Sequence, residues 1–153
     1  MSVLRWYKGL SIAWQQVCAA SFGLAELPAD VSTFEASPTT SSFDLAALER
    51  SMNGEQAQVR AIVRVFLDEG PLQMAAIRAA VDERDAVRIR AAAHTLKGSA
   101  GYLRATGVVE AARELEEVGG KSELEKAAVV YRRLDTEMTR LLYDLRKLQE
   151  QPV

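Results

Sequence analysis

Cysteine and histidine are almost absent from this sequence of 153 residues, since each occurs once, as Cys18 and His94. A single cysteine cannot form an intramolecular disulfide, a thiolate metal cluster or a CxxC redox pair, and this fits a reducing cytosol. Zinc and di-iron sites in helical bundles need several converging ligands, which one histidine without a Glu-x-x-His pair cannot supply. We therefore expect a cytoplasmic chain with no metal or cofactor of its own.

The chain also lacks a long apolar run and an excess of one charge. The most apolar stretch near the start, residues 10–27, is interrupted by Gln15 and Gln16 and does not have the layout of a signal peptide or a membrane span. The 19 basic and 21 acidic side chains nearly cancel, leaving a net charge of −2. This balance provides no overall attraction to nucleic acid or an anionic membrane, so we expect neither as a partner.

Composition divides the chain into three parts. Residues 28–42 concentrate proline, serine and threonine, which predicts a linker. Before it, residues 1–27 carry apolar side chains at helical spacing and are predicted to form an amphipathic helix. Its apolar face is too large to stay exposed, so it should cover this chain's own bundle, the same segment of a second copy, or a preceding domain. After it, residues 43–149 form the main domain.

The main domain is predicted to be all-helical. It contains no alternating, β-branched run between turn signals, which argues against strands. Four long apolar faces joined by short connections favour an antiparallel up-and-down four-helix bundle, with a short leading helix at residues 44–51. Sustained heptads could instead indicate an intermolecular coiled coil, but only the last helix keeps them strictly.

Local signals predict where these helices begin, end or bend. Two pairs resemble N-terminal capping pairs, Asn53 with Gln56 and Ser122 with Glu125. Gly70-Pro71 predicts a kink or short break, because proline lacks the backbone donor and disfavours helix in the residue before it. The remaining signals are Asp85 as the cap of a helix over about residues 85–105, Thr106-Gly107 as the start of the next helix and Gly119-Gly120 as its end.

His94 is predicted to lie on the outward face of the helix at residues 85–105. At ~100° per residue, the large apolar side chains of this helix fall near 200° from His94. The strip within ~60° of His94 contains Arg90, Lys97, Gly98 and Gly101. It therefore carries an imidazole, two cations and two residues without side chains.

Each part of this strip suits the transfer of a phosphoryl group. A neutral imidazole is a nucleophile whose N–P bond is labile enough to be passed on, and Lys97 can offer positive charge to a phosphoryl oxygen. Gly98 and Gly101 cost about 1 kcal/mol each relative to alanine, and they have a use if the backbone of another protein must approach His94. A lone helical histidine is usually a surface residue without function, but packing and propensity do not explain these glycines.

These residues resemble a known family. His94-Thr-Leu-Lys97-Gly98-Ser99-Ala100 is similar to the H-x-x-K-G-[SA]-[SA] signature of histidine phosphotransfer (HPt) domains. The resemblance covers about residues 43–149 and implies a four-helix bundle with an exposed phosphoaccepting histidine on the second long helix. Further similar segments are Phe43-Asp44, Phe66-Leu67 and Leu115-Glu116.

The resemblance implies a phosphorelay function. His94 would accept a phosphoryl group from the aspartyl phosphate of a receiver domain and pass it to another receiver, with Lys97 stabilising the charge and without autonomous kinase activity. The receivers would belong to response regulators or a hybrid sensor histidine kinase, and Mg²⁺ would be needed only in them. We expect Arg90, Gly98, Gly101 and Arg104 to dock the receiver, although Arg104 stands where many members have a glycine and could instead be solvated.

Two alternatives share some of these features. An autophosphorylating histidine kinase also places its histidine on a helical hairpin, but residues 95–99 do not resemble the H-E-x-x-P pattern and we expect no nucleotide-binding domain to follow. A helical interaction module that carries no phosphate is the second alternative. A phosphorylation assay with an aspartyl-phosphate receiver distinguishes that module from the phosphotransfer function.

Overall fold

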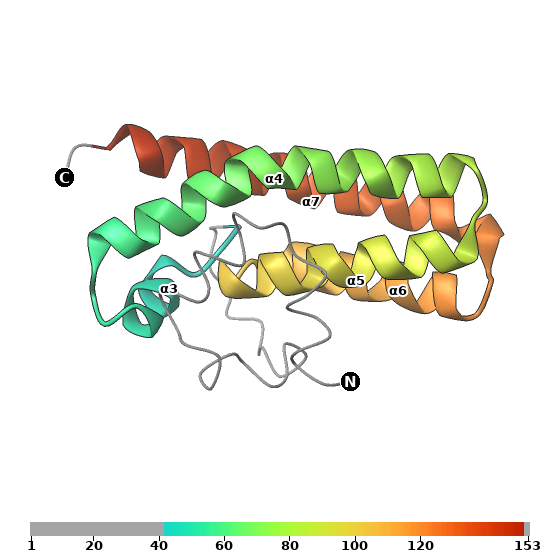
Figure 1. Ribbon diagram of the computed structural model, residues 1–153, viewed down its shortest axis with the longest axis horizontal. Coiled ribbons are helices and arrows are strands. Elements are labelled where there is room, and N and C mark those ends of the chain that lie inside the picture. Colours follow the sequence, from blue (N-terminus) through green and yellow to red (C-terminus); the bar gives the residue numbers. More distant parts are fainter. Residues whose placement is uncertain (1–41, 152–153) are drawn as a thin grey trace.

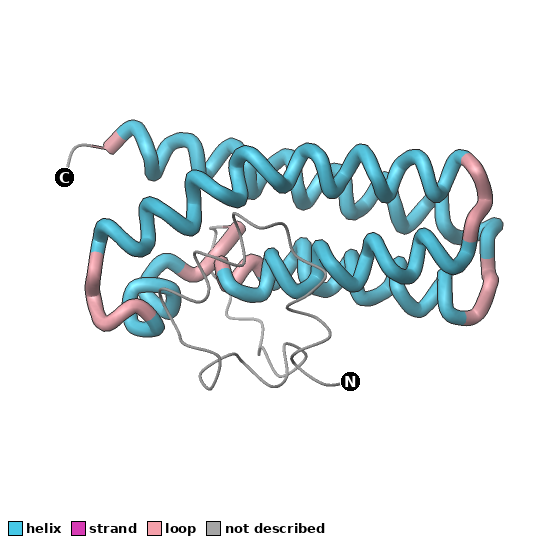
Figure 2. Tube along the Cα trace, in the orientation of Figure 1, coloured by secondary structure: helices cyan, strands magenta, loops and turns pink. Residues whose placement is uncertain are grey.

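The described part of the chain, residues 42–151 of a computed structural model, consists of one short helix and four long ones (Figure 1). No strand occurs within these residues, and Figure 2 shows how short the connections are beside the helices. The predicted all-helical class is confirmed. The helices are α3 (Leu45–Ser51), α4 (Gln56–Asp82), α5 (Ala86–Tyr102), α6 (Thr106–Gly120) and α7 (Leu124–Glu150).

The four long helices form an antiparallel up-and-down bundle. Each packs against the next one in the sequence, and α4 also packs against α7, which closes the ring. Because α4 and α7 have 27 residues each while α5 and α6 have 17 and 15, the first pair is longer, about 40 Å against about 25 Å. The short helix α3 lies at the end where the longer pair extends beyond the shorter one (Figure 1). There the N–H of Asp44 donates to the carbonyl of Arg104 at 3.2 Å.

The core consists of the apolar faces that the helical spacing predicts. Ile89 and Leu96 of α5 are fully buried, as is Leu103 directly after it. In α7, Leu134 is fully buried, whereas Leu148, close to the end of the helix, is only partly buried. The sequence periodicity therefore identified the faces on which the bundle depends.

The four connections between the helices share one backbone conformation. In each of them the second residue after the helix has a positive φ, which is uncommon for residues other than glycine. At the end of α4, for example, the N–H of Arg84 donates to Val81 (3.1 Å) and the N–H of Asp85 donates to Ala80 (3.0 Å). This is the Schellman motif, which satisfies the last carbonyls of the helix. The four residues in this position are Asn53, Arg84, Arg104 and Ser122.

Three local predictions differ from the structure. Asn53 and Ser122 do not cap the following helices, since α4 and α7 begin after Glu55 and Glu123 without a side-chain cap. Both residues instead complete the C-terminal motif of the helix before them, because that motif needs a residue that tolerates a positive φ. Of the kink or short break expected at Gly70-Pro71, the break is absent, because α4 continues through Pro71. Phe66 and Met74, buried on either side of Pro71, pack this stretch into the core and oppose an interruption.

Other helix boundaries agree with their signals. The side chain of Asp85 caps α5 by accepting from the N–H of Arg88 at 3.1 Å, and α6 runs from Thr106 to Gly120. The short leading helix is present as α3, capped by Asp44. The predicted amphipathic helix of residues 1–27 and nearly all of the predicted linker at residues 28–42 lie outside the described residues.

The connection between α6 and α7 generates a test of backbone strain. Replacing the exposed Ser122 with glycine should raise the free energy of unfolding by about 0.5–1 kcal/mol. The strain energy of a serine in the left-handed conformation is removed, and this gain exceeds the free-energy cost of the extra backbone entropy that glycine loses on folding. Urea denaturation measures this. As a control, Ala128→Gly at an exposed position inside α7 should lower the stability by about 1 kcal/mol. An S122G protein no more stable than the wild type would contradict the strain argument.

Candidate functional site

The hairpin of α5 and α6 brings together side chains that are distant in the sequence. A three-residue connection, residues 103–105, joins these antiparallel helices, so residues equally far from it lie at the same level. His94 lies 10 residues before Arg104, the middle of the connection, and Glu116 lies 12 residues after it, which is a difference in level of about 3 Å. The two residues are therefore close in level, and their side chains meet across the hairpin.

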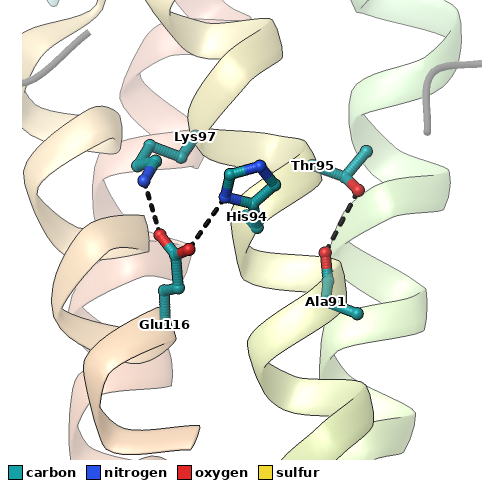
Figure 3. Close-up of polar contacts among 5 residues, drawn as sticks. All are labelled: Ala91, His94, Thr95, Lys97 and Glu116. Atoms are coloured by element: carbon teal, nitrogen blue, oxygen red, sulfur yellow. Dashed lines mark hydrogen bonds and ion pairs between the residues drawn. The ribbon is translucent and has the colours of Figure 1, made fainter. Parts of the chain in front are cut away.

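Glu116 binds both His94 and Lys97 (Figure 3). One carboxylate oxygen, Oε1, lies 2.8 Å from Nδ1 of His94, and the other, Oε2, lies 2.6 Å from Nζ of Lys97. His94 and Lys97 are one turn apart on α5, so a single carboxylate on α6 can reach both. The three side chains form one charged cluster, which we call the His94–Glu116–Lys97 triad.

The triad fixes which ring nitrogen of His94 is available for chemistry. Burial raises the pKa of Glu116, but hydrogen bonds from His94 and Lys97, together with their positive charge, outweigh burial and hold it below its ordinary 4.5. An ionised carboxylate only accepts hydrogen bonds, so Nδ1 of His94 donates to it. In the neutral imidazole, Nε2 then carries the lone pair. Figure 3 shows this nitrogen on the side of the ring away from Glu116.

His94 and Lys97 are less exposed than the helical periodicity of α5 predicts. Each side chain is 22% exposed, and that of Glu116 is 13% exposed. The helical-wheel argument treats α5 in isolation, whereas in the structure both side chains turn toward Glu116 on α6. The imidazole therefore sits at the rim of the bundle, partly shielded from water but open on one side.

Gly98 and Gly101 are buried, which differs from the exposed strip that the wheel predicts. The difference arises because the end of α5 is enclosed on every side, and residues 98–103 are all buried. Exposure therefore gives no support to a docking role for either glycine, and that role stays a prediction.

Arg104 and Arg90 occupy different parts of the hairpin. Arg104 is the positive-φ residue of the α5–α6 connection, with φ of 58°, in the position where many relatives were expected to have glycine. Burial lowers its pKa, against an opposing effect of Asp44. Arg90 is exposed one turn before His94 and forms no ion pair within residues 42–151. Its side chain lies over Gly120, with Cδ 3.8 Å from where a Cβ on that glycine would be.

The sequence argument placed Glu116 only within a resembling segment and did not assign it a role. The signal that points toward it is the short connection, because an antiparallel hairpin that turns at residues 103–105 places Glu116 within about 3 Å of the level of His94. Helical periodicity orients the residues of one helix relative to each other and does not register them against a second helix. Loop length therefore indicates the region of α6 that contains Glu116, whereas the spacing of residues within α5 does not.

The same part of the chain lacks two other kinds of functional feature, a metal centre and a membrane-spanning helix. Residues 42–151 contain no group of three or more histidine, cysteine, aspartate or glutamate side chains placed to hold a metal ion. Within those residues, no helix has the length and apolar character needed to cross a membrane.

Comparisons with known proteins show the family to which this chain belongs. The family model of the Hpt domain matches residues 61–144, more than half of the chain and inclusive of the whole triad. The chain belongs to the Hpt domain family. Histidine phosphotransfer in phosphorelays is the general function of Hpt domains, and the resemblance seen in the sequence is confirmed.

A solved structure also matches this Hpt domain. It is the histidine-containing phosphotransfer protein B (HptB) of Pseudomonas aeruginosa PAO1, with a TM-score of 0.70 and 18% sequence identity. The match covers 75% of this chain and 100% of the HptB chain. At this identity the likeness establishes the helical bundle. No curated protein matches the sequence significantly.

The lowered pKa of Glu116 predicts a pH-dependent contribution to stability. At neutral pH, Glu116→Gln should lower the free energy of unfolding by about 1–3 kcal/mol, the range for hydrogen bonds to charged groups. Since the folded-state pKa lies below the ordinary 4.5, this contribution is fully present above that pH and is lost as the pH falls through the folded-state value. Urea denaturation at a series of pH values measures the difference between the two proteins.

Glu114→Gln is the matched control on the same helix. Glu114 is 47% exposed and pairs with Arg133, so its removal should change stability by no more than about 1 kcal/mol. If the loss in E116Q were the same at pH 3.5 as at pH 7, the ionised triad could not be its source.

Proposed function

We propose that His94 accepts a phosphoryl group on Nε2 from a receiver domain's aspartyl phosphate and passes it to the aspartate of another receiver. The observation that carries this proposal is the bond from His94 Nδ1 to the Glu116 carboxylate, at 2.8 Å. It occupies one ring nitrogen of the one histidine in the sequence and leaves the other available. Membership of the Hpt domain family supports the same chemistry.

The transfer step follows from this arrangement. Nε2 attacks phosphorus, the N–P bond forms, and the bond between phosphorus and the aspartate oxygen breaks, which returns the receiver's carboxylate. Nδ1 keeps its proton, so the phosphorylated ring carries positive charge that the Glu116 carboxylate stabilises. The reverse sequence of bonds transfers the group to a second receiver. No proton has to leave the ring in either direction.

Lys97 is proposed to stabilise the phosphoryl group. Its ammonium has three donors, and the bond to Glu116 uses one of them. The other two can bind phosphoryl oxygens as negative charge gathers there in the transition state. Lys97 would therefore link the carboxylate that orients the ring with the group that the ring receives.

Arg90 is the docking residue that the structure supports most directly. It is exposed one turn from His94, and its guanidinium has no ion pair in the described part of the chain. A receiver that carries acidic side chains around its phosphorylated aspartate would meet this cation on approach. Gly98, Gly101 and Arg104 stay in the proposed docking surface as predictions. The partners are receiver domains of response regulators or of a hybrid sensor kinase in the cytoplasm, and Mg²⁺ is held by those receivers.

The phosphoacceptor role is tested by labelling. Phosphate from a phosphorylated receiver should label the protein in an acid-labile, base-stable form, because phosphohistidine hydrolyses in acid. His94→Gln should abolish the label while the fold is kept, since the glutamine amide can still donate to Glu116. Labelling and circular dichroism are measured on the same preparations. Undiminished labelling of the folded H94Q protein would exclude His94 as the acceptor, and an unlabelled wild type would favour a phosphate-free interaction module.

The role of Lys97 is tested by transfer kinetics at saturating receiver. Lys97→Ala should slow the saturated rate about 5-fold to 150-fold, equivalent to about 1–3 kcal/mol, because a charge-assisted hydrogen bond to the transition state is lost. Lys97→Arg should recover part of the rate, because it keeps the charge. Arg90→Ala is the control, since loss of a docking residue raises the receiver concentration needed for half-maximal transfer without lowering the saturated rate. A K97A protein with the normal saturated rate would place Lys97 outside the reaction.

A further inference from the structure

Gly119 lies where α6 comes closest to the main chain of α5. A Cβ added to Gly119 would lie 2.7 Å from the backbone nitrogen of Arg90 and 2.9 Å from the backbone oxygen of Ala86. These two atoms close one turn of α5, the turn immediately before His94. Because both are backbone atoms, no side-chain rotation can make room for a methyl group. The spacing of the two helices at this point therefore requires glycine.

The neighbouring Gly120 differs in this respect. A Cβ there would meet only the side chain of Arg90, at 3.8 Å and 3.9 Å, which is ordinary contact. Both glycines have φ values outside the positive range, so neither is needed for backbone conformation. Both were also expected only to end the helix. Only at Gly119 does the backbone of α5 leave no room for a side chain.

The close approach occurs one turn from the carboxylate that holds the histidine. Glu116 precedes Gly119 by three residues and so lies on the same side of α6. Its two bonds to α5, 2.8 Å to His94 and 2.6 Å to Lys97, join the helices there, and the imidazole bond lengthens if the helices separate. A shift of α6 away from Arg90 would move the backbone of Glu116 in the same direction.

We infer that Gly119 is a positioning residue for phosphotransfer: by letting α6 pack against the backbone of α5, it holds the Glu116 carboxylate on His94 and Lys97. The inference rests on the proposed role of the triad, and it adds a residue that does not touch the reacting atoms. It explains why a poor helix former stands inside the last turn of α6, where alanine would otherwise favour the helix.

The test compares Gly119→Ala with Gly120→Ala as the matched control. Titration of the Glu116 carboxyl by NMR should show its pKa raised toward or above the ordinary 4.5 in G119A, because the hydrogen bonds that lower it are weakened while burial persists. The phosphotransfer rate at saturating receiver should fall ~10-fold or more, as expected when a reacting group loses its orientation. G120A should match the wild type in both measurements.

A double-mutant cycle separates positioning from a general structural effect. If Gly119 acts through Glu116, Gly119→Ala should slow transfer in the wild type but have little further effect in a Glu116→Gln background. An equal loss in both backgrounds, or an unchanged Glu116 pKa in G119A, would overturn the inference. The titration does not involve phosphate, so it decides the question even if His94 is not phosphorylated.

If G119A does not fold, the titration is repeated in the double variant G119A/G120A. Alanine at position 120 adds helix propensity and so stabilises α6. If this double variant unfolds as well, Gly119 is required for the bundle itself and the positioning role is rejected.

Discussion

The rest of this site depends on one constraint, which is the Glu116 carboxylate enclosed between the closely packed helices α5 and α6. Glu116 is 13% exposed, and in such surroundings a negative charge is stable only when donors and cations surround it. His94 and Lys97 supply both from a single turn of α5. The orientation of the ring, the position of its proton and the position of the lysine all follow from satisfying that one anion.

The location of the triad at the rim of the bundle meets two requirements of the phosphotransfer proposed for His94. Electrostatic interactions are stronger where water is partly excluded, which favours the bonds that orient the imidazole. A fully buried ring could not be reached by a receiver, whereas His94 keeps 22% of its side chain exposed. The long helices α4 and α7 and the short α3 supply the core that holds the hairpin rigid, and contribute none of the triad.

The sequence predicted those features that are decided within one helix. The spacing of Ile89, Leu96 and Leu103 identified the buried face of α5, and Asp85 marked its start, because side-chain periodicity and caps are local properties. Features decided between elements were missed or misassigned. Glu116 meets His94 through the register of two helices, and Gly98 is buried because the whole end of α5 is enclosed. Ser122 resembled a cap for the helix after it but completes the motif of the helix before it.

The three-residue connection at residues 103–105 is therefore as much a part of the chemistry as the side chains it aligns. One residue inserted within α6 before Glu116 would move that carboxylate by about 1.5 Å along the axis and turn it by about 100°, away from the imidazole. The connections at residues 83–85 and 121–123 impose no such register on the triad, since each joins the hairpin to a scaffold helix. Circular permutants opened at either of these two points would preserve the hairpin that holds the triad as one covalent unit.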